Sequence, residues 1–465
     1  MAHQARTWAE KEFGDAELGD ERRTLRLVGM AEGALSRPAG RITEVFRTES
    51  ERQGAYDFLE NEEIEASDVL AATVRASVRR VAKQPYAFVA IDGTSLSLVD
   101  HRRLKDFGAV GAYKDFGRGL KLIHAYVINQ HGVPSGVSSQ IWWARPDTFV
   151  KKKQFRPLRT KETVHWLEAI DETASQFKEH GRGTRPWFLL DREGDNWPTL
   201  RRLVDGGELF TVRSCWDRRL RTAPDEPRVY LRETLRQARR RYVSYIDVPA
   251  GPGRKARRAR LEVSASSVVL DLKNGWGKKR YKRALNAVLV VERGTTPRDE
   301  KPIKWELLTS HPIKTVADLK LVVFSYSQRW RIEELHKTWK SGACRVEETQ
   351  LQTKARVIKW ATIMVAVASR IERIKRLARE QPNEPASVEL SEHEILALIK
   401  LKRLHKKRTE TISGSVPTIE QAMRWLADLG GYTGKSSGGP PGSITIRRGL
   451  DYIAPLVLVL QAGDL

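Results

Sequence analysis

Short apolar runs alternate with amphipathic stretches along the chain, and this pattern predicts a mixed sheet flanked by helices. Residues 86–91 and 185–190 are two mostly apolar runs, each as long as a buried strand and each followed by an aspartate. Residues 120–128 alternate between apolar and polar positions, and residues 137–143 form the next strand after a turn at 129–132. Three consecutive strands joined by short turns predict an antiparallel meander.

Helical periodicity follows the meander. Residues 162–180 have apolar positions on one helical face and stop at Gly181. Residues 196–204 are a second predicted helix, and residues 209–213 a further strand. The order of elements is therefore three strands, a helix and a fourth strand, with acids at the ends of the first and fourth strands. This order is typical of a ribonuclease-H-like domain. We therefore expect an α/β fold with a ribonuclease-H-like mixed sheet flanked by helices.

Residues of about 214–305 interrupt this order with further alternating segments, which we interpret as a β-rich insertion. Basic clusters separate its strands, at 239–241, 254–260 and 278–283. The later helices are expected at 316–340, 354–379, 391–407 and 419–429, and a Gly/Pro/Ser linker at 436–442. The expected organisation is a helical N-terminal domain (1–70), a catalytic domain (71–370) and a helical C-terminal domain (371–465).

The charge balance favours a polyanionic partner. The chain has 82 Lys and Arg against 58 Asp and Glu, a net charge of +24. Such a field attracts nucleic acid, and an anionic membrane surface is the second candidate. No apolar run is long enough to span a bilayer and no signal-peptide pattern is present, so we expect no membrane association. Two cysteines, Cys215 and Cys344, are too few for a disulfide framework, which favours a reducing cytoplasm.

Two aspartates at the ends of apolar strands indicate a candidate metal site. Asp92 and Asp191 follow the first and fourth predicted strands. If those strands are neighbours, the two carboxylates meet, and hard divalent ions such as Mg²⁺ prefer carboxylate oxygens. The alternative interpretation is that each aspartate simply begins a turn.

The segment 326–340 supplies a candidate third acid. On one continuous helix, at about 100° per residue, five polar residues fall within about 80° of one another. They are Tyr326, Arg329, Glu333, Lys337 and Lys340. A salt-bridged solvent face is the alternative, but Trp330 and Trp339 on the same helix are costly to expose, which favours Glu333 as a metal ligand flanked by phosphate-gripping donors. Glu334 lies about 100° away and is expected to point elsewhere.

With these residues in view, the sequence resembles the DDE transposases of the insertion-sequence-four group over nearly its whole length. The residues that carry the resemblance lie at 8–10, 18–27, 53–58, 92–96, 142–147 and 191–195, with Tyr326, Arg329, Glu333 and Lys340 matching the family's Y-R-E-K signature. Several motifs in the family's order are far more specific than any one of them. Asp191 is followed by Arg-Glu-Gly where Arg-Glu-Ala is more usual, and the basic loops and C-terminal tail align loosely.

The resemblance implies a role for each matched residue. Asp92, Asp191 and Glu333 would hold two Mg²⁺ ions, with Mn²⁺ able to substitute. The implied DNA contacts are Tyr326, Arg329 and Lys340 on phosphates around a flipped base, Trp305 stacking on that base, Arg23 and Arg26 on the transposon end, and Arg213 and Lys337 with less support. Without the resemblance, Trp305 reads as an ordinary strand residue of the core.

The resemblance also implies a reaction and partners. The family works by cut and paste: a nick frees a 3′-hydroxyl, a hairpin forms and is opened by water, and the 3′ end attacks target DNA. Two protomers would pair through the C-terminal helices, giving a homodimer on double-stranded DNA in a bacterial cytoplasm, acting at the nucleoid. Two other hypotheses remain open, namely a ribonuclease-H-class nuclease without strand transfer and a non-catalytic DNA-binding inhibitor of transposition.

Overall fold

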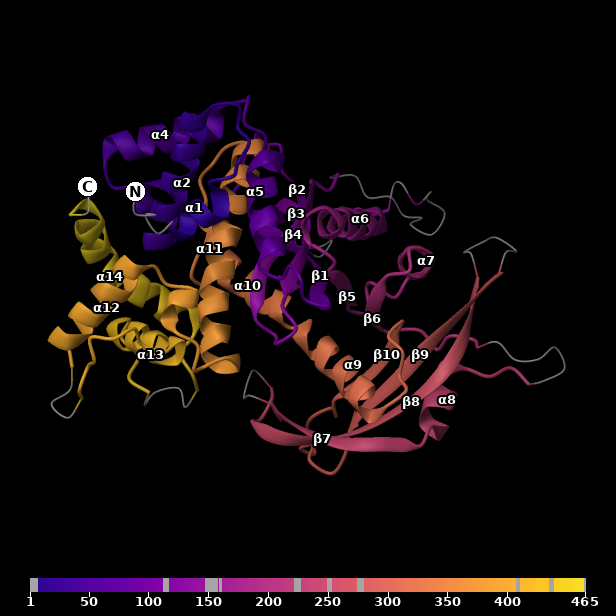
Figure 1. Ribbon diagram of the computed structural model, residues 1–465. Coiled ribbons are helices and arrows are strands. Elements are labelled where there is room, and N and C mark those ends of the chain that lie inside the picture. The colour runs from indigo at the N-terminus through magenta and orange to yellow at the C-terminus, as the bar shows by residue number, and fades with distance from the viewer. Residues whose placement is uncertain are drawn as a thin grey trace.

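One mixed ten-stranded sheet organises the computed structural model, with helical regions at one end (Figure 1). The structure describes residues 7–111, 117–146, 158, 161–220, 227–248, 253–273, 280–406, 410–434 and 439–463. Three parts of the sequence motifs lie outside these ranges: Asp147, residues 278–279 and residues 436–438.

The predicted ribonuclease-H-like core is confirmed. Its strands are β1 (Tyr86–Ser97), β2 (Gly108–Val110), β3 (Gly117–Ile128), β4 (Pro134–Trp143), β5 (Arg185–Leu190) and β6 (Leu209–Arg213). β3 pairs antiparallel with β1 on one side and with β4 on the other, while β5 pairs parallel with β1 and β6 parallel with β5. The strands that carry Asp92 and Asp191 are therefore direct neighbours, as the strand order predicted. The short strand β2 was not predicted from the sequence.

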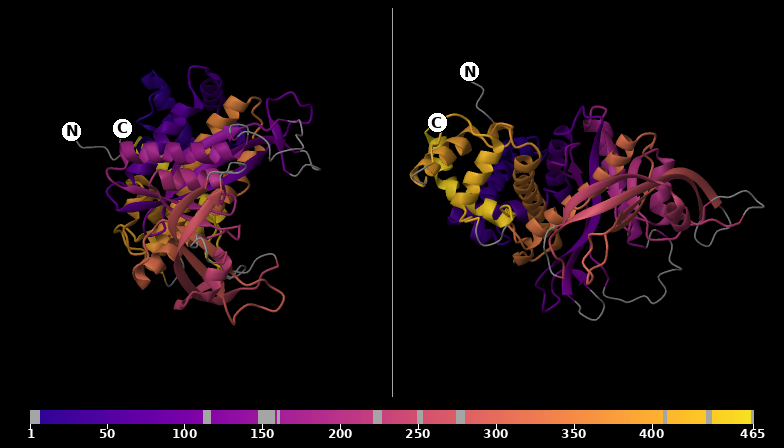
Figure 2. Two further views of the ribbon diagram at one scale, coloured as in Figure 1. Left: turned by 90° about the vertical axis from the view of Figure 1, so that its right-hand side faces the viewer. Right: turned by 90° about the horizontal axis from the view of Figure 1, so that it is seen from below.

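The insertion extends this sheet instead of forming a separate layer. It contributes α8 (Leu231–Gln237), β7 (Arg240–Val248), β8 (Arg257–Lys273), β9 (Arg280–Glu292) and β10 (Lys304–Thr309). β10 pairs antiparallel with β6, so the ten strands are continuous, and the insertion lies at the opposite end from the N- and C-terminal helices (Figures 1 and 2). Part of its basic character is neutralised internally, because Arg257 pairs with Glu292 at 2.7 Å and with Glu300 at 2.6 Å.

Helices cover both faces of the core sheet. The helices are α5 (Ala66–Arg79), α6 (Thr163–His180) and α7 (Trp197–Asp205) on one side, and α9 (Val316–Gln328), α10 (Arg331–Lys340) and α11 (Lys354–Glu380) on the other. Side chains alternate between faces along a strand. In β1, Phe88 and Ala90 accordingly pack on the α9–α11 side, whereas Val89 and Ile91 pack against α5, α6 and α7.

The terminal regions are helical, as predicted. They comprise α1 (Trp8–Phe13), α2 (Glu21–Ser36), α3 (Ile42–Val45) and α4 (Glu49–Glu60), then α12 (Glu392–Leu404), α13 (Ile419–Leu429) and α14 (Ser443–Ala462), with 3₁₀ turns η3 (Val346–Glu348) and η4 (Ala386–Val388). The predicted caps are present, since Asp20 accepts from the Arg22 amide and Ser391 forms a capping box with Glu394. Within the described residues, none of the helices is both long and apolar enough to cross a bilayer.

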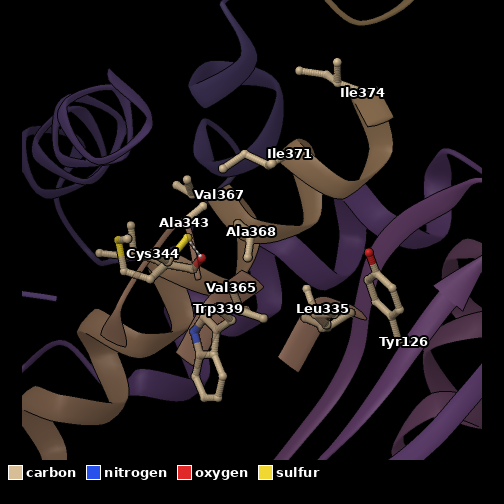
Figure 3. Packing of buried hydrophobic residues seen from close by; sticks show 14 of the residues in the cluster. Tyr126, Leu335, Trp339, Ala343, Cys344, Val365, Val367, Ala368, Ile371 and Ile374 are labelled. Atoms are coloured by element: carbon tan, nitrogen blue, oxygen red, sulfur yellow. Dashed lines mark hydrogen bonds between the residues drawn. The ribbon is translucent and has the colours of Figure 1, made fainter. Parts of the chain in front are cut away.

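Helix α11 joins the core to both terminal regions. It packs against β4 and α10 on one side and against helices of the N- and C-terminal regions on the other. Figure 3 shows Leu335 and Trp339 of α10 packed among α11 residues such as Val365 and Ala368. The domain boundaries expected at 70 and 370 fall inside α5 and α11, so these two helices run across both of the expected borders.

We predict that Gly136→Ala destabilises the fold. Gly136 in β4 has a φ of +136°, and an added Cβ would lie 2.0 Å from Oγ of the buried Ser77 on α5. Backbone strain and overpacking together should cost about 2 kcal/mol and lower the unfolding temperature. The control Gly29→Ala, in open space on α2, should be neutral or stabilising by about 0.5–1 kcal/mol. Equal unfolding temperatures for the two variants would contradict this packing.

Candidate active site

The pairing of β1 with β5 places Asp92 and Asp191 side by side. The last registered pair of these parallel strands is Ile91 with Leu190, and each aspartate is the next residue. Because side chains alternate, both carboxylates belong to the face that α9 and α10 cover. The prediction that the first strand ends at Ile91 was wrong: β1 continues to Ser97, because its antiparallel pairing with β3 persists after β5 has ended.

Asp92 lies in a crowded, mostly buried environment. Its side chain is 18% exposed, and its Oδ1 accepts from the Gly93 amide at 2.8 Å. Burial, followed by repulsion from the charges of Asp191 and Glu333, raises the pKa of Asp92 to about 7, although Arg329 opposes the shift. The direction of the shift agrees with Asp191 and Glu333 both lying near Asp92.

The predicted single helix 316–340 is broken at its middle. α9 ends at Gln328, α10 begins at Arg331, and Arg329 and Trp330 form the turn between them. Amides at the joint bond three residues back, as Arg329 does to the Tyr326 carbonyl and Glu333 to the Trp330 carbonyl, both at 3.1 Å. The winding is tighter at this joint, yet Arg329 still pairs with Glu333 four residues later. Trp330, expected to be buried, is 51% exposed, whereas Trp339 is fully buried.

The turn directs Arg329 between two of the acids. Its Nη2 lies 2.6 Å from Oε1 of Glu333 and its Nη1 lies 3.4 Å from Oδ2 of Asp92. The guanidinium therefore lies between these carboxylates and pairs with both. Among the described residues no three His, Cys, Asp or Glu side chains are gathered into a ready-made metal group. Carboxylate oxygens still suit a hard divalent cation as ligands. The site is partly open, and the negative charge of its acids exceeds the positive charge that Arg329 supplies.

Glu333 and Glu334 face different surroundings, as expected from their positions. Glu334 forms an ion pair with Arg376 of α11 and lies 3.5 Å from Arg331. Farther along α10, Lys340 Nζ lies 3.5 Å from Oε1 of Glu347, while Lys337 is exposed. Glu334 thus serves packing between α10 and α11, and Glu333 is the acid turned toward Asp92.

Tyr326 and Trp305 pack together beside the acids. Tyr326 is 4% exposed, and its ring meets the half-buried indole of Trp305 edge-on at 5.4 Å. Arg213, at the end of β6, donates to the Lys304 carbonyl at 2.9 Å, which links it to the strand that carries Trp305.

A pocket of about 350 Å³ lies where β6 ends and β10 begins. Its lining is mostly cationic and comprises Arg192, Arg213, Ser214, Cys215, Arg232, Lys304 and Glu306. Arg192, Arg232 and Lys304 were not predicted from the sequence as a group. They follow β5, lie on α8 and begin β10, respectively, and no local pattern relates such distant positions.

The two arginines predicted to touch a DNA end lie on α2. Arg23 forms an ion pair with Glu63 and donates to the Leu18 carbonyl at 3.1 Å, so it supports the local fold. Arg26 is exposed, and its guanidinium lies against Gly54 of α4.

A family model described as transposase DNA-binding matches residues 5–64. This range takes in the helices from α1 to α4 and includes both Arg23 and Arg26. Residues 5–64 are therefore similar to a transposase DNA-binding domain, and they precede an α/β body with a ribonuclease-H-like sheet. The match supports a transposase that binds DNA.

We predict that Asp92→Asn stabilises the metal-free protein at neutral and alkaline pH. The native pKa of about 7 exceeds the value of about 3.9 in an unfolded chain. Between these values the native state holds more protons, so stability falls as pH rises and levels off above pH 7. Removing the charge should therefore raise the free energy of unfolding at pH 8 by up to about 4 kcal/mol, at about 1.4 kcal/mol per pKa unit. The unfolding temperature should rise more at pH 8 than at pH 5.

Asp205→Asn is the matched control for this titration. A hydrogen bond from Arg283 lowers the pKa of Asp205, so its carboxylate stabilises the native state above about pH 4. Its removal should lower the unfolding temperature at pH 8. If Asp92→Asn also lowers it there, Arg329 outweighs the repulsion among the acids.

Proposed function

We propose that this protein is a cut-and-paste DNA transposase of the insertion-sequence-four group, resembling the transposon-five transposase. The observation that carries the proposal is the β1–β5 register, after which Asp92 and Asp191 follow side by side. Arg329 of the turn before α10 pairs with both Asp92 and Glu333, which supports Glu333 as the third acid. The transposase DNA-binding match at residues 5–64 supports it independently. A DNA-binding domain joined to a crowded acidic site on a ribonuclease-H-like sheet fits an enzyme that works on phosphodiester bonds.

In this proposal Asp92, Asp191 and Glu333 hold two Mg²⁺ ions, which Mn²⁺ can replace. When bound, such ions neutralise the scissile phosphate and activate a water or hydroxyl for attack. The raised pKa of Asp92 supports a site short of positive charge. Arg329 now occupies the space between Asp92 and Glu333, so we expect its guanidinium to move toward the DNA phosphate as the carboxylates take up cations.

The neighbouring side chains would hold the DNA. Arg329 and Lys340, with the Tyr326 hydroxyl, are proposed to grip phosphates, and Arg213 and Lys337 to add contacts on either side. Trp305 is proposed to stack on an extruded base, which requires Tyr326 to yield part of the edge-on contact that covers the indole. Arg213 lies in the cationic pocket, which supports an anionic ligand there.

The proposed reaction alternates two hydrolyses with two strand transfers. Water attacks the phosphorus at the transposon end, the P–O3′ bond breaks, and a 3′-hydroxyl is released. That hydroxyl attacks the opposite strand to form a hairpin, water reopens it, and the freed 3′ end joins target DNA. Each step exchanges one P–O bond for another, so the same acids serve throughout and no covalent enzyme intermediate forms.

A homodimer in the cytoplasm at the nucleoid is proposed as the working form. The last helix, α14, supports a pairing surface because it leaves Leu458 and Val459 58% and 66% exposed. Large apolar side chains that stay exposed close together on one helix suit contact with a second protomer.

We predict that Glu333→Gln abolishes DNA cutting while Glu334→Gln retains it. The two variants remove the same charge from adjacent positions on α10. Loss of a metal ligand should cost several kcal/mol of transition-state stabilisation, about 10³-fold in rate or more. Glu334→Gln should stay within about tenfold but unfold at a lower temperature, because Arg376 loses its ion-pair partner. The assay combines Mg²⁺, donor DNA carrying the sequences that flank the gene, and a supercoiled plasmid.

The products of that assay separate the rival functions. Joined donor and plasmid support a transposase, and nicks without joining indicate a nuclease. Chelation with EDTA should stop both reactions. Asp92→Ala should abolish cutting and spare DNA binding; a wild-type protein that binds DNA and never cuts is a non-catalytic inhibitor. Equal loss in Glu333→Gln and Glu334→Gln would contradict the assignment of Glu333.

We also predict that Arg26→Ala weakens DNA binding. One lost phosphate contact should reduce affinity by about tenfold and flatten the slope of log K against log salt by about 1. Lys400→Ala removes an equal charge from an exposed position on α12 and should change neither. Fluorescence anisotropy of a labelled duplex over a salt series measures both. A similar drop in the two variants would mean that only net charge matters.

A further inference from the structure

A buried chain of hydrogen bonds runs beneath the candidate active site and joins two strands to two helices. His124 of β3 places its Nδ1 3.1 Å from Nε2 of His336 on α10. On its other side, His124 Nε2 lies 2.8 Å from the side-chain nitrogen of Gln140 on β4. Thr362 of α11 donates its hydroxyl to Gln140 Oε1 at 2.9 Å. All four side chains are buried, from 0% exposed for His124 to 8% for His336.

The direction of each bond follows from which groups can only donate. The Trp142 indole N–H, a donor without an acceptor, points at Gln140 Oε1 from 3.5 Å. The Gln140 nitrogen therefore donates to His124 Nε2. His124 then carries its proton on Nδ1 and donates to His336 Nε2, so one tautomer of each ring satisfies the chain.

This chain connects the strand of one candidate ligand to the helix of another. His124 is the registered partner of Asp92 across β3 and β1, so the two side chains share one face of the sheet. His336 lies three residues after Glu333, about one turn along α10. The contact between the two histidines thus fixes the height of α10 over the strand that carries Asp92.

We propose that His124 and His336 are positioning residues, which hold α10 so that the Glu333 carboxylate faces Asp92 and Asp191 as a divalent cation binds. The inference rests on the proposed function. Hydrogen bonds are directional, so the contact between the two rings specifies both a distance and an angle. The break before α10 increases the need for such a link, because α9 does not hold α10 as one rigid rod.

Burial supports this role by keeping both rings neutral. Burial, with His336 as neighbour, lowers the pKa of His124 well below its usual range. Burial and the charge of Lys340 lower the pKa of His336 to about 3. A neutral pair keeps one donor and one acceptor facing each other.

The test is a Mn²⁺ titration of the full-length protein, with free Mn²⁺ followed by electron paramagnetic resonance. His336→Met keeps the bulk of the ring but removes the acceptor, and should raise the half-saturating Mn²⁺ concentration by tenfold or more, as for other groups that orient metal ligands. His336→Gln keeps an acceptor near the position of Nε2 and should stay within about threefold of wild type. Asp92→Asn identifies binding at the site.

Leu335→Ala separates positioning from general loosening. Leu335 is fully buried on the same helix, so its truncation lowers the unfolding temperature without touching the chain of hydrogen bonds. Its half-saturating Mn²⁺ should stay within about threefold. A wild-type value in His336→Met, or an equal shift in Leu335→Ala, would overturn the inference. Wild-type protein that binds no more Mn²⁺ than Asp92→Asn would instead overturn the proposed function, and the inference with it.

Discussion

The parallel pairing of β1 with β5 is the constraint on which the candidate site depends. Ile91 and Leu190 form the last registered pair, and both aspartates follow immediately. A slip of one residue would turn one strand's whole set of side chains to the opposite face and separate the two carboxylates. The residues before each aspartate are buried on both faces of the sheet, where close packing tolerates little change in side-chain shape, and this opposes the slip. The same residues that build the core therefore set the spacing of the acids.

The charges of Asp191 and Glu333 oppose that of Asp92, and Arg329 offsets part of this repulsion. Without that guanidinium, Asp92 and Glu333 would face each other uncompensated at a largely buried site. The offset is incomplete, because the pKa of Asp92 remains raised to about 7. One delocalised positive charge is a weaker counterion than a pair of divalent cations.

The sequence was sufficient for most of the fold and for which acids to consider. The bounds of β5, β6 and α13 were predicted from apolar periodicity, which survives folding because it reflects burial. The break at Arg329 was not predicted, because neither Arg329 nor Trp330 is a helix-breaking residue. The turn coincides with a tertiary contact from Arg329 to Asp92, which local sequence does not show. β1 was predicted too short for a related reason: its polar second half is held by pairing with β3, which local pattern does not show. His124 and His336 gave no signal, because they are 212 residues apart and meet only in three dimensions.

The distribution of charge explains more than its total. A net charge of +24 indicates that the chain attracts a polyanion. It does not indicate which surface the polyanion contacts. From the sequence, Arg257 and Arg260 of the insertion were expected in exposed basic loops. In the structure Arg257 pairs with Glu292 and Glu300, and Arg260 pairs with Glu262. By contrast Arg26 on α2, Lys337 on α10 and Arg192 just after Asp191 are exposed. Cations already paired with acids of the same insertion release few counterions on binding, so the exposed group should dominate affinity for DNA.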